Sequence, residues 1–332
     1  MSAERKLDHI KICLEKQVEA GDPGFDRVVL KHFDLPEINF DEISMKKRFL
    51  GKKLEKPFLI EAMTGGSKEG EDINKSLAKI AEEFGLAFGV GSQRVAIENP
   101  KLEKTFWVRD VAPSVLLIAN LGAVQLNYGY SLEECEKAVE MIDADALALH
   151  LNPLQEIIQP EGNRNFSNLI EKINLVAKEL KKPVIVKSVG CGISYDIANK
   201  LKVKAIDVSG VGGTSWALIE GYRSGKRSLE IAKKFSDWGL STVDSLLEVS
   251  KLKERFEIIA SGGIRDGIHA AKSFALGADI VGMALPLLRI LKASGKNAVK
   301  EYLDKFFLEL KIAMFLTSSR NVDELYGKYI LK

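Results

Sequence analysis

The chain has 332 residues, and its 48 lysines and arginines nearly balance its 46 aspartates and glutamates, for a formal net charge of +2. This balance excludes the single-sign field that draws proteins onto nucleic acid or anionic membranes. No apolar run approaches the roughly 18 residues that a membrane span needs. Three widely spaced cysteines argue against a disulfide framework and a CxxC metal site, so we expect a cytoplasmic protein.

Short apolar runs recur along the chain, and most are followed by a stretch of helical periodicity. In chain order the eight runs cover residues 57–66, 85–94, 114–123, 146–153, 183–192, 205–214, 257–265 and 279–286. Strands that are apolar on both faces are typical of parallel sheets covered by helices, and eight strand-then-helix units predict a closed (β/α)₈ TIM barrel. The alternative is a doubly wound open sheet, but no run is followed by the GxGxxG turn of a dinucleotide site.

We expect a single domain, in which residues 1–55 form an N-terminal extension, residues 56–295 the barrel and residues 296–332 C-terminal helices. Within the barrel, Asp266 is the predicted N-cap of a helix that carries apolar Ile268, Ala271 and Ala275 at helical spacing and stops near Gly277. The last long helix carries a single apolar stripe, which predicts docking on the barrel. The stripe consists of Val299, Leu303, Phe306, Leu310 and Met314.

The segment "ALALHLNPLQEIIQPEGN" gathers polar residues where the fourth strand ends. The loops after the strands form the active site of such barrels, so we predict that the polar residues of this segment belong to an active site. His150, Asn152, Gln155 and Glu156 suit either a hard divalent ion completed by substrate phosphates or a general acid/base set. A core histidine is the plainer interpretation of His150. One carboxylate without a second His or Cys argues against a zinc cage.

Glycines and hydroxyls in three late loops predict a phosphate site. The loops are "SGVGGTSW", "SGGIRDG" and "GMALP" at residues 209–216, 261–267 and 282–286. Tight turns alone are the simpler interpretation for other glycines nearby. Earlier strand ends, "AMTGG", "GSQR" and "AN", offer amides and hydroxyls that suit a flat heteroaromatic, and Arg94 could grip a phosphate in two places.

Lys187 emerges from the apolar run "PVIVK", where an ammonium is costly unless an anion faces it. Its candidate partners are a cofactor that becomes anionic and a Schiff-base substrate, and a surface lysine is the plainer alternative. Cys191 is a weak candidate nucleophile because no histidine follows in its loop.

Together, "MTGG", "GSQR", "HLNPLQE", "QPEGN", "VKSVGCGIS", "SGVGGTSW" and "SGGIRDG" resemble the type 2 isopentenyl-diphosphate isomerase family, from "RKLDHI" to the last strand. The resemblance implies interconversion of isopentenyl and dimethylallyl diphosphate without net redox change. It implies FMN in its reduced form, Mg²⁺, NADPH as reductant and a homotetramer or larger assembly. It also implies that the N-terminal arm orders on substrate or against a neighbouring subunit.

The resemblance also implies roles for individual residues. The implied FMN contacts are Ala62, Met63, Thr64, Ser92, Asn120, Lys187, Ser209, Thr214, Gly262, Gly263, Arg265, Ala284 and Leu285. The implied substrate contacts are Arg5, Lys6, His9, Ser92, Arg94, His150, Asn152 and Gln155. Glu156 corresponds to the metal ligand, Lys187 to the residue that stabilises anionic reduced flavin, and Gln155 and Glu220 are candidates for moving the second proton.

Two positions depart from the family pattern. Ser188 replaces an acidic residue, and Glu61 stands where an apolar or small residue is expected; both put the packing and charge near the flavin in doubt. The main alternative is an FMN oxidoreductase of the 2-hydroxy-acid oxidase type, which would share Lys187 and the phosphate cradle but lacks "HLNPLQE". An IMP-dehydrogenase-like enzyme would need a catalytic cysteine, and a flavin-binding sensor would need fewer converging polar groups.

Overall fold

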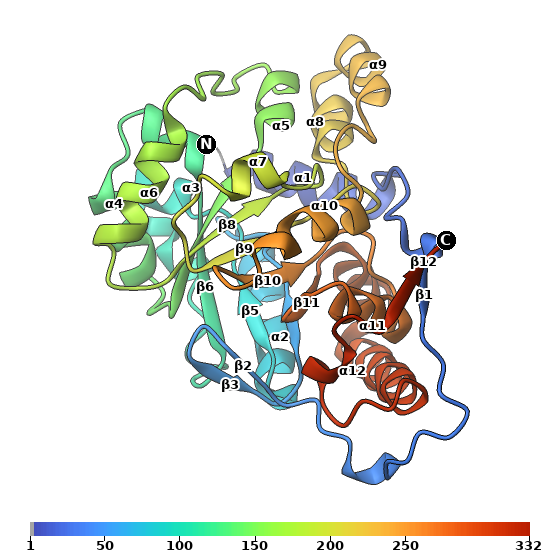
Figure 1. Ribbon diagram of the computed structural model, residues 1–332. Helices are drawn as coiled ribbons and strands as arrows, with labels where there is room; N and C mark the ends of the chain where they lie inside the picture. Colours follow the sequence, from blue (N-terminus) through green and yellow to red (C-terminus); the bar gives the residue numbers. More distant parts are fainter. Residues whose placement is uncertain (1–2) are drawn as a thin grey trace.

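The computed structural model describes residues 3–332 and contains a closed barrel of eight parallel strands surrounded by helices (Figure 1). The strands are β4 (Phe58–Ile60), β5 (Ala87–Gly89), β6 (Leu116–Gly122), β7 (Ala146–Leu151), β8 (Val184–Ser188), β9 (Ala205–Asp207), β10 (Glu257–Ala260) and β11 (Ile280–Met283). Each strand pairs with its neighbours in chain order, and β11 closes the circle on β4. The predicted TIM barrel and its eight strands are confirmed.

Helices follow the strands and form the outer layer. They are α2 (Lys68–Phe84), α3 (Arg94–Glu98), α4 (Leu132–Glu140), α5 (Pro153–Ile158), α6 (Leu169–Glu179), α7 (Tyr195–Ala198), α8 (Trp216–Ser224), α9 (Lys226–Lys234), α10 (Thr242–Val249), α11 (Gly267–Ala275) and α12 (Leu285–Leu316). Local sequence determines many of their ends. Ser67 caps α2, and Ser131 and Glu134 form a capping box at α4, because side-chain oxygens there satisfy N–H groups that a helix start leaves unpaired.

The predicted cap of α11 is confirmed, since the Asp266 carboxylate accepts the N–H of His269 at 2.7 Å. Ala271 and Ala275 are fully buried. Ile268, the first apolar residue of this spacing, is 49% exposed, because the helix turns that position away from the barrel. The helix stops as expected, and Gly277 follows with φ +108°.

The barrel interior is filled by side chains spaced two residues apart along the strands, since alternate strand residues face opposite sides. Leu59, Ile118, Ala148, Ile185 and Ile259 belong to this inner cluster, which is separate from the core between the strands and the helices. The hairpin of β2 (Lys47–Phe49) and β3 (Lys52–Leu54) adds Phe49 and Leu54 to the same cluster. The amino ends of the strands are therefore plugged, and the open end lies at their carboxyl ends.

The two terminal regions meet on the barrel. From the N-terminal extension, β1 (Val28–Leu30) pairs antiparallel with β12 (Tyr329–Leu331). The region 296–332 is thus not helical throughout: it holds most of α12, then a 3₁₀ turn at Val322–Leu325 and β12. The predicted apolar stripe of α12 is buried along its whole length. Gly295 interrupts α12 with φ 80°, one residue before the expected start of the C-terminal region.

The first helix, α1 (Ala3–Glu15), lies across the carboxyl ends of the strands and contacts α8, α12 and α2. Its inward residues Lys6, His9 and Ile10 are each at most 8% exposed. Among the helices of residues 3–332, none is both long enough and apolar enough to cross a membrane.

Candidate active site

One large cavity opens at the carboxyl ends of the strands, with a volume of about 1540 Å³ counted out to its mouth. Residues from all eight strand ends and from α1 line it. Every residue predicted for the site except Glu220 is part of this lining. The structure thus brings the predicted residues together, while their individual roles stay predictions.

The floor of the cavity is a layer of polar side chains. On each strand that contributes to it, the polar residue lies two positions after an apolar residue that fills the barrel interior. This polar layer consists of six side chains: Glu61, Asn120, His150, Lys187, Asp207 and Ser261. They stand two positions after Leu59, Ile118, Ala148, Ile185, Ala205 and Ile259, which all belong to the inner cluster. Glycines occupy the two remaining positions of this level, Gly89 and Gly282. The period of two along each strand therefore predicts which polar groups share the floor.

Lys187 lies in the middle of this layer and is only 8% exposed, so the surface-lysine alternative is wrong. Its Nζ donates to Oδ2 of Asp207 at 2.8 Å and to Oε2 of Glu61 at 3.2 Å. Asp207 is itself held by the hydroxyl of Ser261 at 2.7 Å. Burial works against the charge of Lys187, but the two carboxyl groups outweigh it and raise the pKa. A permanent ammonium favours stabilising an anion over forming a Schiff base, which needs the neutral amine.

Glu61 occupies the same layer from the end of β4 and is 5% exposed. Burial, together with the negative charge of Asp207, raises the pKa of Glu61 to about 8, although Lys187 acts in the opposite direction. Its Oε1 has no hydrogen-bond partner among the residues that the structure describes. The expectation that Glu61 alters the local charge is consistent with this position. Ser188, the other departure, is buried on β8 and accepts the N–H of Cys191 at 3.3 Å.

His150 is held in one orientation, because its Nδ1 lies 2.8 Å from Oδ1 of Asn120. Asn120 is fixed in turn by Gln93, whose Oε1 accepts the backbone N–H of Asn120 at 2.9 Å. Burial, with Lys187 and Lys6 nearby, lowers the pKa of His150 to about 3. The ring is therefore neutral, with Nδ1–H donating to Asn120 and Nε2 left as an acceptor.

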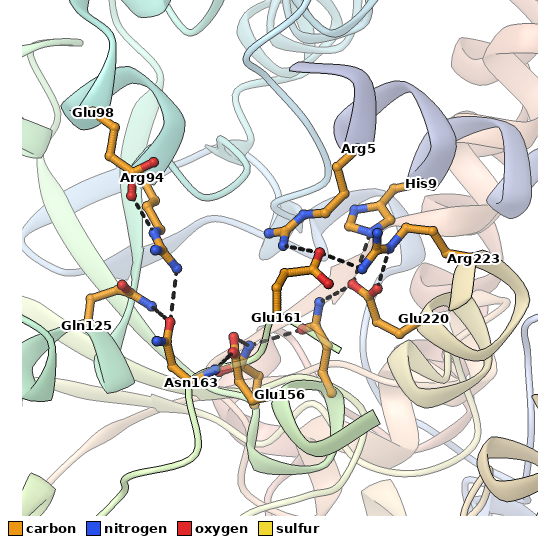
Figure 2. A network of polar contacts seen from close by, with 12 residues as sticks. Arg5, His9, Arg94, Glu98, Gln125, Glu156, Glu161, Asn163, Glu220 and Arg223 are labelled. Carbon is orange, nitrogen blue, oxygen red and sulfur yellow. Dashed lines mark hydrogen bonds and ion pairs between the residues drawn. The ribbon is translucent and has the colours of Figure 1, made fainter. Parts of the chain in front are cut away.

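A network of charged groups ties α1 to the rim of the cavity (Figure 2). His9 Nε2 lies 3.0 Å from Oε1 of Glu220, and Gln155 Nε2 donates to the same oxygen at 3.2 Å. Arg223 donates to the other oxygen of Glu220 at 2.7 Å and to Glu161 at 2.6 Å. Arg5 reaches Glu161 from α1 at 3.3 Å. Glu161 and Arg223 were missed by sequence reasoning, since no local pattern shows that α1, α5 and α8 converge.

Glu220 is fully buried behind the cavity wall and touches the site only through His9 and Gln155. Burial alone would raise its pKa, but the hydrogen bond from His9 and the ion pair with Arg223 lower the pKa of Glu220 to about 2. Glu220 is therefore a carboxylate, and any proton it exchanges with the cavity passes through a neighbour.

The segment after β7 holds the carboxylate of Glu156 in place. Both carboxylate oxygens accept hydrogen bonds, Oε1 from Asn152 Nδ2 at 2.8 Å and Oε2 from the N–H of Asn163 at 2.6 Å. Asn152 Oδ1 is buried and finds no hydrogen-bond partner within residues 3–332. In the described part of the chain, no group of three or more His, Cys, Asp or Glu side chains could hold a metal ion. A carboxylate with an unpaired amide oxygen fits a hard ion that takes its other ligands from water and phosphate.

The late loops fit a phosphate. A Cβ at Gly213 would lie 2.8 Å from the nitrogen of Gly263, so the absence of side chains is what leaves this space open. Within residues 3–332, no acceptor takes the backbone N–H of Gly262 or Gly263. These donors can therefore bind an anion. Arg265 is also at the cavity, but its guanidinium pairs with Glu19, a partner that the sequence did not reveal.

The remaining candidate of the sequence, Cys191, is not an activated thiol. Burial raises its pKa, whereas a nucleophilic cysteine needs a lowered pKa. Cys191 also lies outside the residues that line the large cavity.

The sequence resembles named protein families. The FMN-dependent dehydrogenase family matches residues 135–332. The isopentenyl-diphosphate delta-isomerase of Ignicoccus hospitalis is 46% identical over 338 residues, covering 99% of this chain and 94% of the relative. The enzyme of that name from Synechocystis sp. is 48% identical over 327 residues, covering 97% of this chain and 93% of the relative.

Solved structures are similar in fold. A mutant flavocytochrome b2 with pyruvate bound superposes with a TM-score of 0.70 at 16% identity, covering 97% of this chain and 82% of that one. A mandelate oxidase mutant with a monooxide FMN adduct gives 0.66 at 15% identity, covering 100% and 92%. At such low identity this likeness establishes the barrel fold and not the reaction.

Proposed function

The chain belongs to the isopentenyl-diphosphate delta-isomerase family and is an isomerase of isoprenoid biosynthesis; from this we propose that it interconverts isopentenyl and dimethylallyl diphosphate with reduced FMN and Mg²⁺. The observation that carries this proposal is the division of one cavity into three parts: a glycine cradle for one phosphate, a polar floor around Lys187, and a cationic roof from α1 and α3. The cofactor and the substrate would then occupy different parts of the same cavity.

The roof supplies the charge that a diphosphate requires. Arg5 and Lys6 reach the cavity from α1, and Arg94 reaches it from α3. Arg94 is already oriented, since Glu98 accepts from Nε at 2.7 Å and Asn163 from Nη1 at 3.0 Å (Figure 2). Guanidinium and ammonium groups bind phosphate oxygens through charge-assisted hydrogen bonds. The arm would thus close over the substrate and exclude water.

Glu156 would hold Mg²⁺, with Asn152 Oδ1 as a second oxygen and the substrate's phosphates and water as the rest of the shell. The two hydrogen bonds to Glu156 fix the direction of its carboxylate. The ion would neutralise the diphosphate without itself touching the alkene.

Isomerisation adds a proton at one carbon and removes one from another, so the site must be dry and must stabilise developing positive charge. Reduced FMN supplies a flat, electron-rich surface for this purpose. Lys187 would stabilise the negative charge of the reduced cofactor. The N–H groups of Gly262 and Gly263 would bind its phosphate.

Gln155 and Glu220 would move the second proton. Gln155 lines the cavity, and its amide donates to Glu220 while its own Oε1 accepts from Asn152 at 3.1 Å. Its amide is thereby fixed between the two groups. Glu220 is ionised and can take a proton through Gln155 or His9. His150, neutral and held by Asn120, would offer Nε2 as an acceptor at the substrate.

The deciding experiment is anaerobic incubation of the protein with isopentenyl diphosphate, FMN, Mg²⁺ and NADPH or dithionite, followed by assay for dimethylallyl diphosphate. We expect product only with reduced flavin and with no matching consumption of NADPH. Omission of Mg²⁺, with chelator present, should abolish turnover. Bound, reducible FMN without product would instead favour the 2-hydroxy-acid oxidase alternative.

A further inference from the structure

Glu61 belongs to the polar layer, but the proposed reaction gives it no task. Its Oε2 accepts from Lys187 at 3.2 Å and from the N–H of Ala62 at 3.2 Å. Its Oε1 is buried and has no hydrogen-bond partner in the described part of the chain. A buried carboxylate oxygen without a donor is costly when the group is ionised.

The space around Oε1 is created by a glycine on the neighbouring strand. A Cβ at Gly282 would lie 2.7 Å from this oxygen. Glu61, Gly282 and Lys187 all line the cavity. The unpaired oxygen therefore lies at the cavity floor, beside residues that are predicted to border the cofactor.

The charge of this floor depends on Glu61. The strands beside β4 place Gly282 and Gly89 at this level, so the charged groups that face Glu61 are Lys187 from β8 and Asp207 from β9. One ammonium faces two carboxyl groups. With Glu61 ionised the cluster has an excess negative charge, and with Glu61 neutral it is balanced.

We propose that Glu61 is a positioning residue that controls how much of the Lys187 charge is available to the bound FMN. When Glu61 is a neutral acid, the ammonium of Lys187 interacts mainly with Asp207 and with the cofactor. As a carboxylate, it draws the ammonium toward itself and adds a negative charge beneath the cofactor. This inference rests on the proposed function, since it requires FMN against Ala62, Met63 and Lys187.

The direction of the effect follows from proton linkage. Glu61 keeps its proton below a pH of about 8 and loses it above. An anionic reduced cofactor disfavours a second negative charge and so raises the pKa of Glu61 further. Reduction of the cofactor therefore takes up one extra proton above that pH, and the midpoint potential of bound FMN falls more steeply with pH there.

The test compares the holoprotein with Glu61→Gln, which keeps the shape and an acceptor for Lys187 but cannot ionise. The midpoint potential of bound FMN is measured by spectroelectrochemistry between about pH 6 and about pH 10. We expect the two curves to run parallel at low pH and the steeper part of the wild-type curve to be missing in Glu61→Gln. Glu61→Ala, which removes the carboxyl altogether, should also lack it.

The matched control is Glu257→Gln. Glu257 is also a partly buried glutamate with a raised pKa and one unpartnered oxygen, but it stands at the opposite end of the barrel, where it accepts the N–H of Leu50 at 3.0 Å. This variant should retain the steeper part.

Curves of wild type and Glu61→Gln that share one shape over the whole range would overturn the inference, even with a constant offset between them. A steeper part that also disappears in Glu257→Gln would do the same. A Glu61-dependent curve in a protein that produces no dimethylallyl diphosphate would uphold the inference and refute the isomerase proposal. Failure of the wild-type protein to bind FMN would refute both.

Discussion

Lys6 shows how a single side chain can prepare the cavity for an anion. It is 7% exposed on the inner face of α1, and among residues 3–332 its ammonium donates only to the carbonyl of Ser92, at 3.3 Å. Burial, and to a lesser degree Arg5, lowers the pKa of Lys6 to about 8. In the free protein Lys6 therefore loses its proton easily, and a bound diphosphate would stabilise the protonated form.

We predict that diphosphate affinity falls as pH rises above about 8. There the free protein has lost the Lys6 proton, and binding must restore it, so the dissociation constant should rise by up to about tenfold per pH unit. Calorimetry with inorganic pyrophosphate in buffers of different ionisation enthalpy measures the proton uptake. Lys6→Met should abolish this uptake, and Lys11→Met, an exposed neighbour on α1, should leave it unchanged. Equal uptake in both variants would contradict the assignment.

Gly213 gives a prediction about the phosphate cradle. The Cβ of Gly213→Ala would lie 2.8 Å from the nitrogen of Gly263, in the space the phosphate needs. Loss of a charged hydrogen bond costs about 1.5–3 kcal/mol, so FMN affinity should fall by at least about tenfold. Quenching of FMN fluorescence by apoprotein measures it. Gly129→Ala, which has backbone strain at φ 90° but no neighbour within 4 Å, should lose stability and keep FMN affinity.

Residue types at strand ends pointed to part of the site, and the family resemblance supplied most of the remaining residues. Lys187 and His150 were identified because polar groups at the ends of apolar runs stand out. Asp207, Glu161, Arg223 and Glu19 were not, because an acid or a base in a loop has no local feature that reveals its partner.

At the scale of elements, α1 is the most consequential helix. It covers the cavity, and its residues Arg5 and His9 are held by Glu161 and Glu220 from the fourth and sixth strand-helix units (Figure 2). The resemblance implied that this arm orders on substrate or against a neighbouring subunit. In the structure it is helical and packs on the same chain, and its ordering by substrate or a subunit stays a prediction.

We predict that Glu161→Gln weakens the closure of α1. It removes the ion pairs to Arg5 and Arg223, but Glu161 is half exposed, so each is worth only about 0.2–1 kcal/mol. Hydrogen exchange of α1 should become faster, and the KM for isopentenyl diphosphate should rise severalfold while kcat changes less. Glu230→Gln, on the exposed face of α9, is the control and should change neither. Unchanged exchange in α1 would show that helix packing alone holds it.

At the scale of the whole molecule, the apolar core consists of two separate clusters, the filling of the barrel and the packing between strands and helices. Helix α12 contributes many residues to the cluster between strands and helices. Phe306 lies 5.2 Å from Phe58 and 5.6 Å from Phe307 between ring centroids, both in edge-to-face geometry. The long C-terminal helix thus belongs to the barrel core, as its stripe predicted.

The homotetramer or larger assembly stays a prediction, which analytical ultracentrifugation would test.

We predict that Phe306→Ala destabilises the protein by about 3–5 kcal/mol, because a fully buried ring leaves a cavity that the barrel cannot fill. The midpoint of denaturant unfolding, followed by circular dichroism, should fall accordingly. Leu308→Ala, two positions along the same helix and 53% exposed, should shift it little. Similar midpoints for the two variants would mean that α12 is only loosely docked.

The amino-acid sequence by itself determined the eight strands, their order and the residues at their carboxyl ends. Those features depend on apolar runs and on alternation within a few residues, which are local. The tertiary structure alone decided that Lys187 lies between Glu61 and Asp207, and that Arg5 and Arg223 share Glu161. These pairs come from segments that are 20 to 156 residues apart. They meet only because the barrel closes with one register, and no local pattern encodes that register.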